Sequence, residues 1–516
     1  MRQAVGIYRS VVAALGHPSL VGVFVIAMLS LGALSVFVGT AVGLISFRDV
    51  GYPDSATLFR IDGLFRSGHL YPDINKPPYL VTIYGPLTYV LLGVPYTIAR
   101  AAGLDPQLLV RLGVVGAMCV CLLLVFSTSR RMHPSRAVAW LCILFAVSST
   151  PFAQWTTQIR GDFLAVGCSL ASIYLLMSSN RNLRVLGSPV LAGIAVLIKS
   201  TFLSAPVAIV LWCLYKRQYR EGALWVAVFA CLIIGGYAIA LWREPLMLDH
   251  LMALRHPVAE YRGALELLWV ALSQPVVPFA ALGFFLIIKN QATGSFLFAL
   301  YWLTSWAVAI GTIPYVGANI NYFWEPLLSS AVLAGAGLHD LCRKDRRAPV
   351  IVTWFLLLLL VRAFSPTLKN DIYNLRMSYA NLVDYKAREA RWDGLVAVVT
   401  GRRFLSSIPD LATHAASPEM MDPYLNAVLV LGGTWSFAPI VSKLDTGVYD
   451  FVAIGTGQAS GVPVYRGVEI WSEETWSALK RSYTPSCVID GIAFWLPKRD
   501  PSQFLSDLNA IGCKPS

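Results

Sequence analysis

The sequence predicts a polytopic α-helical membrane protein of about eleven spans, with a small C-terminal α/β domain outside the membrane. Hydrophobic residues make up 56% of the 516 residues and charged residues only 14%, and the mean hydropathy is +0.61. Soluble domains carry roughly 25% charged residues, so lipid must form part of the solvent of this chain. Apolar segments recur along residues 1–365, whereas residues 366–516 have a mixed, soluble composition.

The basic residues are distributed along the chain as they are in membrane proteins. The formal net charge is +12, but most Lys and Arg stand in short runs between apolar segments, such as Lys216-Arg217 and Arg343-Lys344. This is the positive-inside pattern of cytoplasmic loops. The basic balance therefore indicates membrane orientation, and we expect no nucleic-acid partner.

The first apolar segment, about 21–47, follows Arg2 and Arg9. It is longer than the roughly 7–15 apolar residues of a signal peptide, so we expect an uncleaved first span with a cytoplasmic N-terminus. A polar first outer loop, residues 48–80, comes next. Further apolar segments lie at about 81–100, 107–128, 136–154, 161–178, 188–215, 222–242, 266–288, 295–313, 321–341 and 349–364.

Two interpretations of these segments give the same number of crossings. In the first, 81–100 crosses the membrane and 188–215 is one span. In the second, 81–100 lies along the surface and 188–215 is a pair of short helices that turn near Lys199. Only the second keeps the arginines between positions 130 and 184 in the cytoplasm, and Pro86 and Pro95 suit a bent interfacial segment. We favour the second.

In that interpretation, polar features from distant parts of the chain face the same outer side. They are the 48–80 loop, Arg160-Gly161-Asp162, Lys199, the 243–265 loop, and Asn319 to Tyr322. Their convergence predicts a functional site on the outer face.

Asp54 follows Pro53 and opens an amphipathic helical pattern in the first outer loop. One interpretation is an N-cap, because Asp is among the best capping residues. The other is a general base that takes a proton from an acceptor hydroxyl. The two roles are compatible.

The other charged residues on this side also allow two interpretations each. Arg160 and Asp162 form either a helix-entry ion pair or part of a site, since charges at a membrane cavity are costly. Lys199 either snorkels to the headgroups or meets an anionic ligand. The 243–265 loop suits lipid phosphate or simple headgroup contact, because it contains His250, Arg255, His256 and Arg262.

The C-terminal region alternates β-like and helix-like stretches, such as 451–454, 487–489 and 473–481. We therefore expect a small α/β domain at 366–516, outside the membrane. Cys487 and Cys513 lie in this region. An oxidising compartment would allow them to form a disulfide, but the sequence gives no geometry that distinguishes the disulfide from two free thiols.

Several short stretches follow one another in a characteristic order: Pro53-Asp54-Ser55-Ala56, Arg66-Ser67-Gly68-His69, Leu70-Tyr71-Pro72-Asp73, Tyr84-Gly85-Pro86-Leu87-Thr88-Tyr89, Ile159 to Ala165, Ala192 to Lys199, Gly317 to Phe323, Met421 to Tyr424 and Tyr449 to Ile454. In this order they resemble the GT-C glycosyltransferases, nearest to the bacterial branch that includes protein O-mannosyltransferases and lipid A aminoarabinose transferases.

The resemblance implies an enzyme of the bacterial inner membrane, a hexosyl- or pentosyltransferase that uses a polyprenyl-phosphate sugar. It would transfer the sugar, with inversion, to an envelope glycan, lipid or protein on the outer face. Asp54 matches the catalytic Asp, and Asp162 a second acidic position. Candidates for the donor phosphate are Lys199, Arg160, Arg255 and Lys76, and candidates for the donor or acceptor pocket are His69, Tyr84, Asn319, Asn321 and Tyr322.

Some positions depart from the family pattern. Relatives commonly have Asp-Glu where this chain has Asp54-Ser55, so a second loop carboxylate is missing. The Lys-Pro-Pro-Leu element of aminoarabinose transferases corresponds here to Tyr84-Gly85-Pro86-Leu87. The sequence shows no Asp-x-Asp pair, so we expect a metal-independent reaction that needs no cofactor.

Two other functions remain as alternatives. A lipid flippase or transporter would show paired broken helices in matching halves, and only 188–215 is predicted to be broken. An inactive scaffold is the other alternative, because Ser55 replaces a carboxylate. For an active transferase, we expect the C-terminal domain to help position the acceptor.

Overall fold

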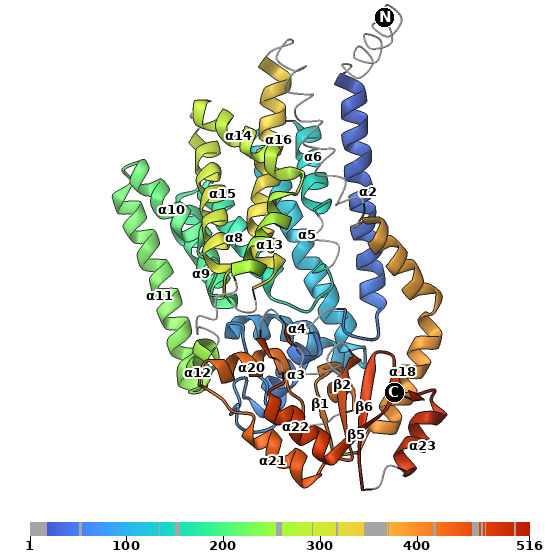
Figure 1. The fold of residues 1–516 in the computed structure, drawn as a ribbon. Coiled ribbons are helices and arrows are strands. Elements are labelled where there is room, and N and C mark those ends of the chain that lie inside the picture. The colour runs from blue at the N-terminus through green and yellow to red at the C-terminus, as the bar shows by residue number, and fades with distance from the viewer. Residues whose placement is uncertain are drawn as a thin grey trace, which may run out of the picture.

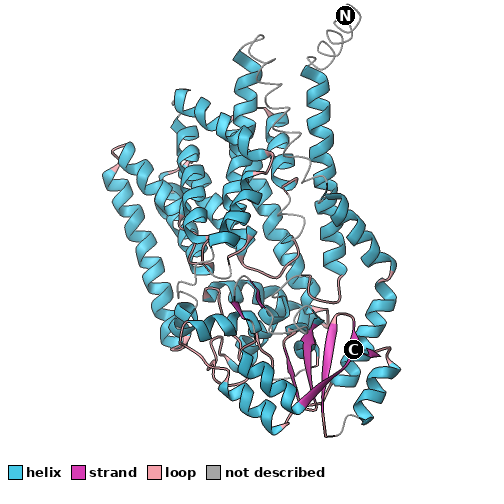
Figure 2. Cartoon of the chain, in the orientation of Figure 1, coloured by secondary structure: helices cyan, strands magenta, loops and turns pink. Residues whose placement is uncertain are grey.

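The computed structural model describes most of the chain (Figures 1 and 2). The described residues are 18–50, 54–133, 135–149, 155–253, 261–290, 293–315, 318–344, 369, 371–415, 419–456, 464–465, 468–469, 471–499 and 502–515. They form a helical bundle at one end of the molecule and an α/β unit at the other end, as Figure 1 shows.

The bundle is built from apolar helices that pack side by side, with α14 against α16, α8 against α9 and α10 against α15. Its helices are α2 (Pro18–Ile45), α5 (Pro106–Met132), α6 (Arg136–Val147), α8 (Asp162–Leu176), α9 (Ser188–Ile198), α10 (Ser204–Tyr215), α11 (Tyr219–Arg243), α13 (Tyr261–Leu272), α14 (Val276–Asn290), α15 (Thr293–Thr312) and α16 (Trp324–Lys344). Two short turns of other helix types, η1 (Leu183–Gly187) and η2 (Ile320–Phe323), join them.

Among the described residues, three helices are long and apolar enough to cross a membrane: Pro106–Met132, Tyr219–Arg243 and Ser295–Thr312. A bent pair, α13 with α14, would make a fourth span. Other apolar segments form shorter helices, and the segment at 349–364 lies outside the described residues. The total of about eleven crossings therefore stays a prediction.

The predicted break in 188–215 is confirmed. Helix α9 ends at Ile198, Lys199 is extended with φ −149° and ψ 116°, and α10 starts at Ser204. Figure 1 also shows α4 (Pro86–Ala102) lying across the end of the bundle, between the bundle and the α/β unit. This arrangement agrees with the second interpretation of 81–100.

The predicted span at 266–288 is not one continuous helix. The segment forms α13 and α14, which meet at an angle of 73°. Pro275 lies in the break, and proline can neither donate an amide hydrogen bond nor admit a helical carbonyl four residues earlier. Thus 188–215 is not the only broken segment, and a single broken segment can no longer be held against a transporter.

The α/β unit contains a five-stranded sheet of order β1-β2-β6-β5-β7. Strands β1 and β2 are parallel and the other neighbours are antiparallel. The strands are β1 (Phe404–Ser406), β2 (Phe451–Gly455), β5 (Tyr483–Ile489), β6 (Ile492–Pro497) and β7 (Lys514–Pro515), with a separate pair, β3 (Val464–Tyr465) and β4 (Val468–Glu469). The predicted strands at 451–454 and 487–489 are confirmed.

Helices cover this sheet: α18 (Tyr385–Val399), α19 (Pro409–His414), α20 (Pro423–Leu431), α21 (Ala438–Thr446), α22 (Glu473–Ser482) and α23 (Ser502–Ala510). The two apolar cores of the α/β unit include Tyr79 and Leu80 of the first loop and Val81, which follows it. The loop therefore shares its packing with the C-terminal unit. Cys487 and Cys513 form a disulfide that joins β5 to the residue before β7.

Candidate active site

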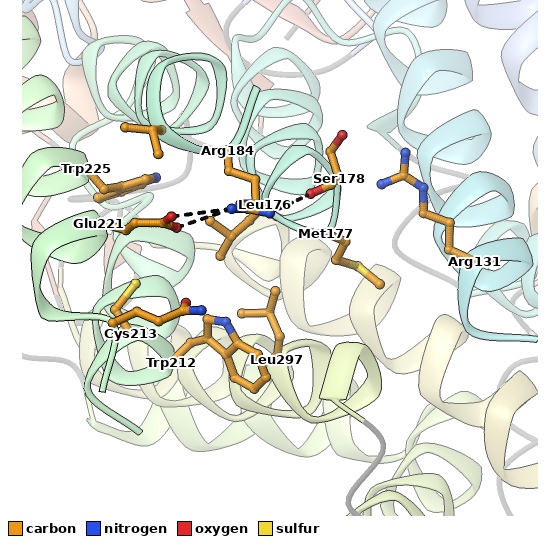
Figure 3. A pocket seen from close by; sticks show the side chains of 12 residues that line it. Arg131, Leu176, Met177, Ser178, Arg184, Trp212, Cys213, Glu221, Trp225 and Leu297 are labelled. Carbon is orange, nitrogen blue, oxygen red and sulfur yellow. Dashed lines mark hydrogen bonds and ion pairs between the residues drawn. The ribbon is translucent and has the colours of Figure 1, made fainter. Parts of the chain in front are cut away.

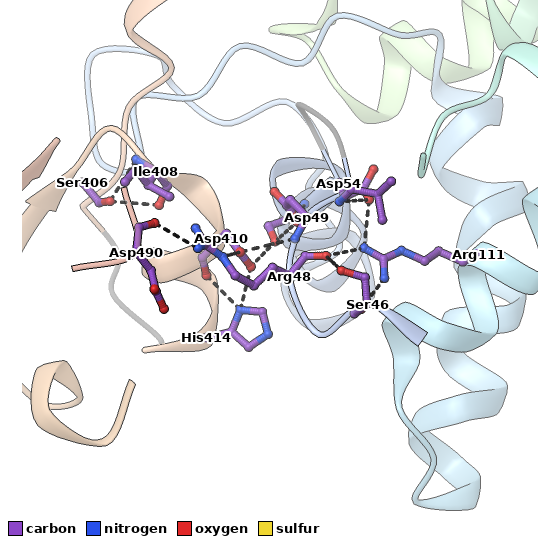
Figure 4. A network of polar contacts seen from close by, with 12 residues as sticks. Ser46, Arg48, Asp49, Asp54, Arg111, Ser406, Ile408, Asp410, His414 and Asp490 are labelled. Carbon is purple, nitrogen blue, oxygen red and sulfur yellow. Dashed lines mark hydrogen bonds and ion pairs between the residues drawn. The ribbon is translucent and has the colours of Figure 1, made fainter. Parts of the chain in front are cut away.

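Asp54 is the first residue of α3 (Asp54–Ser67) and is fully buried. Its Oδ1 accepts a hydrogen bond from the Ile159 amide at 2.6 Å. Its Oδ2 accepts one from Arg111 Nη2 at 3.1 Å and one from the Val50 amide at 3.3 Å. All these donors lie outside α3, so the carboxylate of Asp54 joins the loop to two bundle segments (Figure 4).

A different carboxylate accepts the hydrogen bond from a backbone amide at the start of α3. The Ser55 amide donates to Asp49 Oδ1 at 3.0 Å. Asp49 therefore accepts from the first turn, as a capping residue does, and the N-cap interpretation of Asp54 is not needed to explain the helix start.

Burial raises the pKa of Asp54 above its usual range, and the Arg111 charge and the Ile159 hydrogen bond oppose this rise. A carboxylate whose pKa lies closer to neutral pH is a stronger base. The environment of Asp54 thus suits proton abstraction.

Arg111 was missed by the sequence interpretation. Its side chain is fully buried, and it donates to the carbonyls of Ser46 and Arg48 as well as to Asp54. The available signal was an arginine in the second turn of an otherwise apolar helix, where a charge is costly without partners.

A second cluster centres on Lys199. Its Nζ lies 2.7 Å from Asp162 Oδ1, and Asn321 Nδ2 donates to the same oxygen at 2.9 Å. The ammonium also lies 4.1 Å from the ring centroid of Tyr322 and 6.0 Å from that of Tyr84. Neither interpretation of Lys199 included this partner, because the only ion pair considered for Asp162 was with Arg160.

The Tyr84-to-Tyr89 motif determines where Lys199 lies. The Gly85 amide and the Thr88 hydroxyl both donate to the carbonyl of Ile198, at 3.0 and 2.8 Å. A Cβ on Gly85 would lie 2.0 Å from the Leu197 carbonyl oxygen. The glycine therefore allows α4 to approach and close the end of α9, immediately before Lys199.

The two clusters are joined by one short segment. Ile159 contacts Asp54, and Asp162, three residues later, contacts Lys199. Between them, the Arg160 guanidinium lies 4.3 Å from the ring centroid of Trp155. The first loop, the start of α8 and the α9–α10 turn thus meet at one end of the bundle, as the convergence argument predicted.

No family model and no curated protein matches the sequence. Among solved structures, ArnT from Cupriavidus metallidurans bound to undecaprenyl phosphate gives a TM-score of 0.59 at 13% identity, over 93% of this chain and 98% of that chain. The oligosaccharyltransferase AglB from Archaeoglobus fulgidus, in complex with an inhibitory peptide and a dolichol-phosphate, gives 0.54 at 10% identity, over 94% and 77%.

The chain has the GT-C fold. The resemblance drawn from short motifs is thereby confirmed at the level of the fold.

The remaining residues predicted for the site make contacts outside the Asp54 and Lys199 clusters or lie outside the described residues. His69 is exposed, with Nδ1 3.8 Å from Glu244, and Lys76 is exposed, with Nζ 3.6 Å from Asp73. The Asn319 side chain accepts from the Ile320 amide at the start of η2. Arg255 lies outside the described residues.

In the 243–265 loop, of which residues 254–260 lie outside the described residues, His250 does not face lipid phosphate as one interpretation expected. His250 is buried; its Nδ1 accepts from the Thr82 amide at 3.0 Å, and its Nε2 lies 2.6 Å from the Pro72 carbonyl. Burial lowers the pKa of His250 to about 4. Its neutral ring therefore holds the first loop and supplies no positive charge for lipid phosphate.

Glu325 is a further buried carboxylate that the sequence interpretation missed. It accepts hydrogen bonds from the hydroxyls of Ser204 at 2.7 Å, Tyr301 at 2.8 Å and Ser169. A small cavity beside it is also lined by Lys199 and Tyr322. An acidic residue at the start of an apolar helix was the available signal.

Among the described residues, no three His, Cys, Asp or Glu side chains are placed to hold a metal ion. The metal-independent reaction stays a prediction.

A cavity of about 470 Å³ lies elsewhere in the bundle, where α5, α8 and α10 end and α11 begins (Figure 3). Arg184 Nη2 lies 3.4 Å from Glu221 Oε1 within it. None of the predicted site residues lines this cavity.

Proposed function

We propose that this chain is a glycosyltransferase that moves a sugar from a polyprenyl-phosphate donor to an acceptor of the cell envelope, with inversion at the anomeric carbon. The GT-C fold supports this proposal, since neighbours of the same fold were solved with undecaprenyl phosphate and with a dolichol-phosphate. The acceptor class is a glycan, a lipid or a protein, and the sugar is a hexose or a pentose.

The observation that carries the proposal is the meeting of Asp54 with the Lys199–Asp162 pair through residues 159–162. A general base and a fixed cation at the same end of the bundle are the two groups that inverting transfer requires. The orphaned atoms beside them point the same way: among described residues, Asp162 Oδ2 and Asn321 Oδ1 are buried without a hydrogen-bond partner. Such groups call for a ligand or water.

In the proposed reaction, the acceptor hydroxyl oxygen attacks the anomeric carbon while Asp54 takes its proton. The bond between the anomeric carbon and the donor phosphate oxygen breaks, and polyprenyl phosphate leaves with the electron pair. Lys199 stabilises the charge that develops on the phosphate. Arg111 orients Asp54, which must have a free lone pair facing the acceptor. The Val50 contact, at 3.3 Å, is the longest of the three that Asp54 accepts.

The contacts rank the donor-phosphate candidates. Lys199 lies beside the orphaned atoms, and Arg160 is two residues from Asp162. The Lys76 ammonium is exposed and close to Asp73 instead. We therefore assign the phosphate to Lys199 and Arg160 first, with Arg255 and Lys76 as secondary candidates.

We place the site on the outer face of a bacterial inner membrane, with a cytoplasmic N-terminus and residues 366–516 outside. The charge pattern of the loops supports this orientation. The Cys487–Cys513 disulfide is in keeping with an oxidising compartment.

A flippase remains the second candidate, because the bundle contains two broken helix pairs, α9–α10 and α13–α14. The two functions differ in their dependence on Asp54. Substitution of Asp54 would remove the proton acceptor that a transferase needs, whereas a transporter needs no general base.

The test compares envelope glycans and glycolipids by mass spectrometry in a deletion strain. The strain carries wild type, Asp54→Asn or the matched control Asp62→Asn, which changes a partly exposed carboxylate on the same helix. Membrane accumulation of all three proteins is checked first. We expect wild type and Asp62→Asn to restore a sugar-sized mass and Asp54→Asn to leave it absent. Equal restoration by Asp54→Asn would contradict the proposal.

A further inference from the structure

The departure at Ser55 has a structural counterpart in the C-terminal unit. Ser55 Oγ lies 2.6 Å from Asp49 Oδ1 and 3.2 Å from Asp410 Oδ1. Asp410 belongs to α19 and is only 3% exposed. The hydroxyl at position 55 thus contacts two carboxylates, and one of them comes from a residue 355 positions later.

Asp410 contacts the chain on both sides of Asp54. Its Oδ2 accepts from the Asp49 amide at 3.3 Å and lies 3.4 Å from Arg48 Nε, before Asp54, while its Oδ1 contacts Ser55, after Asp54. The Arg48 carbonyl in turn accepts from Arg111, the partner of Asp54, at 2.7 Å. Figure 4 shows this network running from His414 through Asp410 to Arg111.

We propose that Asp410 is a positioning residue for Asp54, so that the C-terminal α/β unit completes the active site. This inference rests on the proposed function. Asp410 does not touch the reacting atoms. It holds residues 48–49 and the first turn of α3, and these set the place of the Asp54 carboxylate.

The charges explain why position 55 carries a hydroxyl. Burial and the neighbouring Asp410 raise the pKa of Asp49 well above its usual range. Burial alone would raise the pKa of Asp410, but His414, Arg48 and the Asp49 amide together outweigh burial and lower that pKa. A glutamate at position 55 would bring a third carboxylate to this buried place, and like charges there repel. A serine instead donates a hydrogen bond.

The expected size of the effect follows from geometry. A displacement of about 1 Å at a reacting group costs roughly 100-fold in rate. Loss of the Asp410 contacts should therefore lower kcat by about 10- to 100-fold. The KM for the donor should stay within about twofold, because Lys199 and Arg160 do not belong to this network.

The experiment uses membranes that contain the full chain. The probe is undecaprenyl phosphate linked to the sugar that the deletion strain lacks, and initial transfer rates give kcat and KM. Variants are Asp410→Asn, Ser55→Ala and the double variant. The matched control is Asp445→Asn, which removes an ion pair with Arg481 in the same unit. Binding of undecaprenyl phosphate by native mass spectrometry shows whether the donor site is intact.

We expect both single variants to lower kcat, the double variant to be no worse than Asp410→Asn, and the control to match wild type. If the substitutions instead caused a general loss of structure, they would weaken donor binding. The losses of kcat from the two substitutions would then combine in the double variant. A kcat for Asp410→Asn within twofold of wild type, or multiplied losses in the double variant, would overturn the inference. Should Asp410→Asn fail to accumulate, an unchanged kcat in Ser55→Ala alone would overturn it as well.

The two proposals fail in different ways. Absence of transfer by wild type would reject the proposed function itself. Transfer by wild type and equal transfer by Asp410→Asn would reject only the positioning role.

Discussion

The Nζ atom of Lys199 lies 2.7 Å from Oδ1 of Asp162, and this ion pair joins the α9–α10 turn to the first residue of α8. Both side chains are buried. A pair of this kind costs desolvation energy and is weak evidence for stability by itself. Together with the orphaned oxygens of Asp162 and Asn321, it agrees with the donor-phosphate site that we propose.

Substitution of one partner of this pair should be more harmful than substitution of both. Lys199→Met leaves the Asp162 carboxylate buried without a counter-charge, although Asn321 still donates to it; breaking a buried ion pair in this way costs about 3–5 kcal/mol. The double variant Lys199→Met/Asp162→Asn removes the stranded charge and should recover much of that stability without recovering transfer. Thermal unfolding in detergent and the envelope assay measure the two effects. Equal stability of Lys199→Met and wild type would contradict this prediction.

Gly85→Ala should separate α4 from the end of α9. The new Cβ would lie 2.0 Å from the Leu197 carbonyl oxygen, so the backbone must shift. We expect a destabilisation of more than about 2 kcal/mol, in the range of overpacked cores, together with lost transfer. Gly116→Ala in α5 is the control, because nothing lies within 4 Å of the place that its new Cβ would occupy. A wild-type unfolding temperature for Gly85→Ala would refute the role of this glycine.

Stability should fall at alkaline pH because of His414. Burial opposes protonation, but the hydrogen bond and charge of Asp410 outweigh it and raise the pKa of His414 to about 9. The unfolded value is roughly 6.5. The stabilisation is therefore complete below about pH 6.5 and is lost as pH rises through 9. Because the His414 ring is partly exposed, we expect this stabilisation to be only about 1 kcal/mol.

The measurement for this prediction compares unfolding temperatures at pH 6.5 and 9. His414→Asn should lose the difference, whereas His69→Asn, at an exposed position, should keep it. The prediction fails if His414→Asn retains the full pH dependence.

Arg111→Gln should shift the pH dependence of transfer. The Arg111 charge opposes the rise in the pKa of Asp54 that burial causes, so its removal should raise that pKa further. Because the base acts when deprotonated, the acidic limb of the kcat profile should move to higher pH. Arg184→Gln, which loses the ion pair with Glu221 in the remote cavity, serves as control. An unmoved limb in folded Arg111→Gln would exclude this coupling.

Several elements could be predicted because their signals are local. The helix that begins at Asp54, the turn near Lys199 and strands at 451–454 and 487–489 follow from the spacing of apolar residues and from polar interruptions, and the structure contains each of them. The bend between α13 and α14 was missed, although Pro275 marks it. The segment is apolar on both sides of the bend, so its hydropathy showed no interruption there.

Side-chain partners were harder to predict. The sequence indicated Asp54, Asp162, Lys199 and Asn321, and the structure brings the last three into contact. It did not indicate Asp49 or Asp410, because each looks like an ordinary loop or helix residue in its own segment. The signal of Arg111, a charge in an apolar helix, was overlooked.

The sequence by itself determined that this chain favours lipid, which ends of its helices are polar, and which residue types gather on one side. Only the tertiary structure decided that Lys199 pairs with Asp162 and that Asp410 holds the start of α3. The reason is physical. Hydropathy and helix periodicity depend on neighbours within a few residues, whereas an ion pair between positions 37 apart, or a hydrogen bond between positions 355 apart, depends on how whole elements pack.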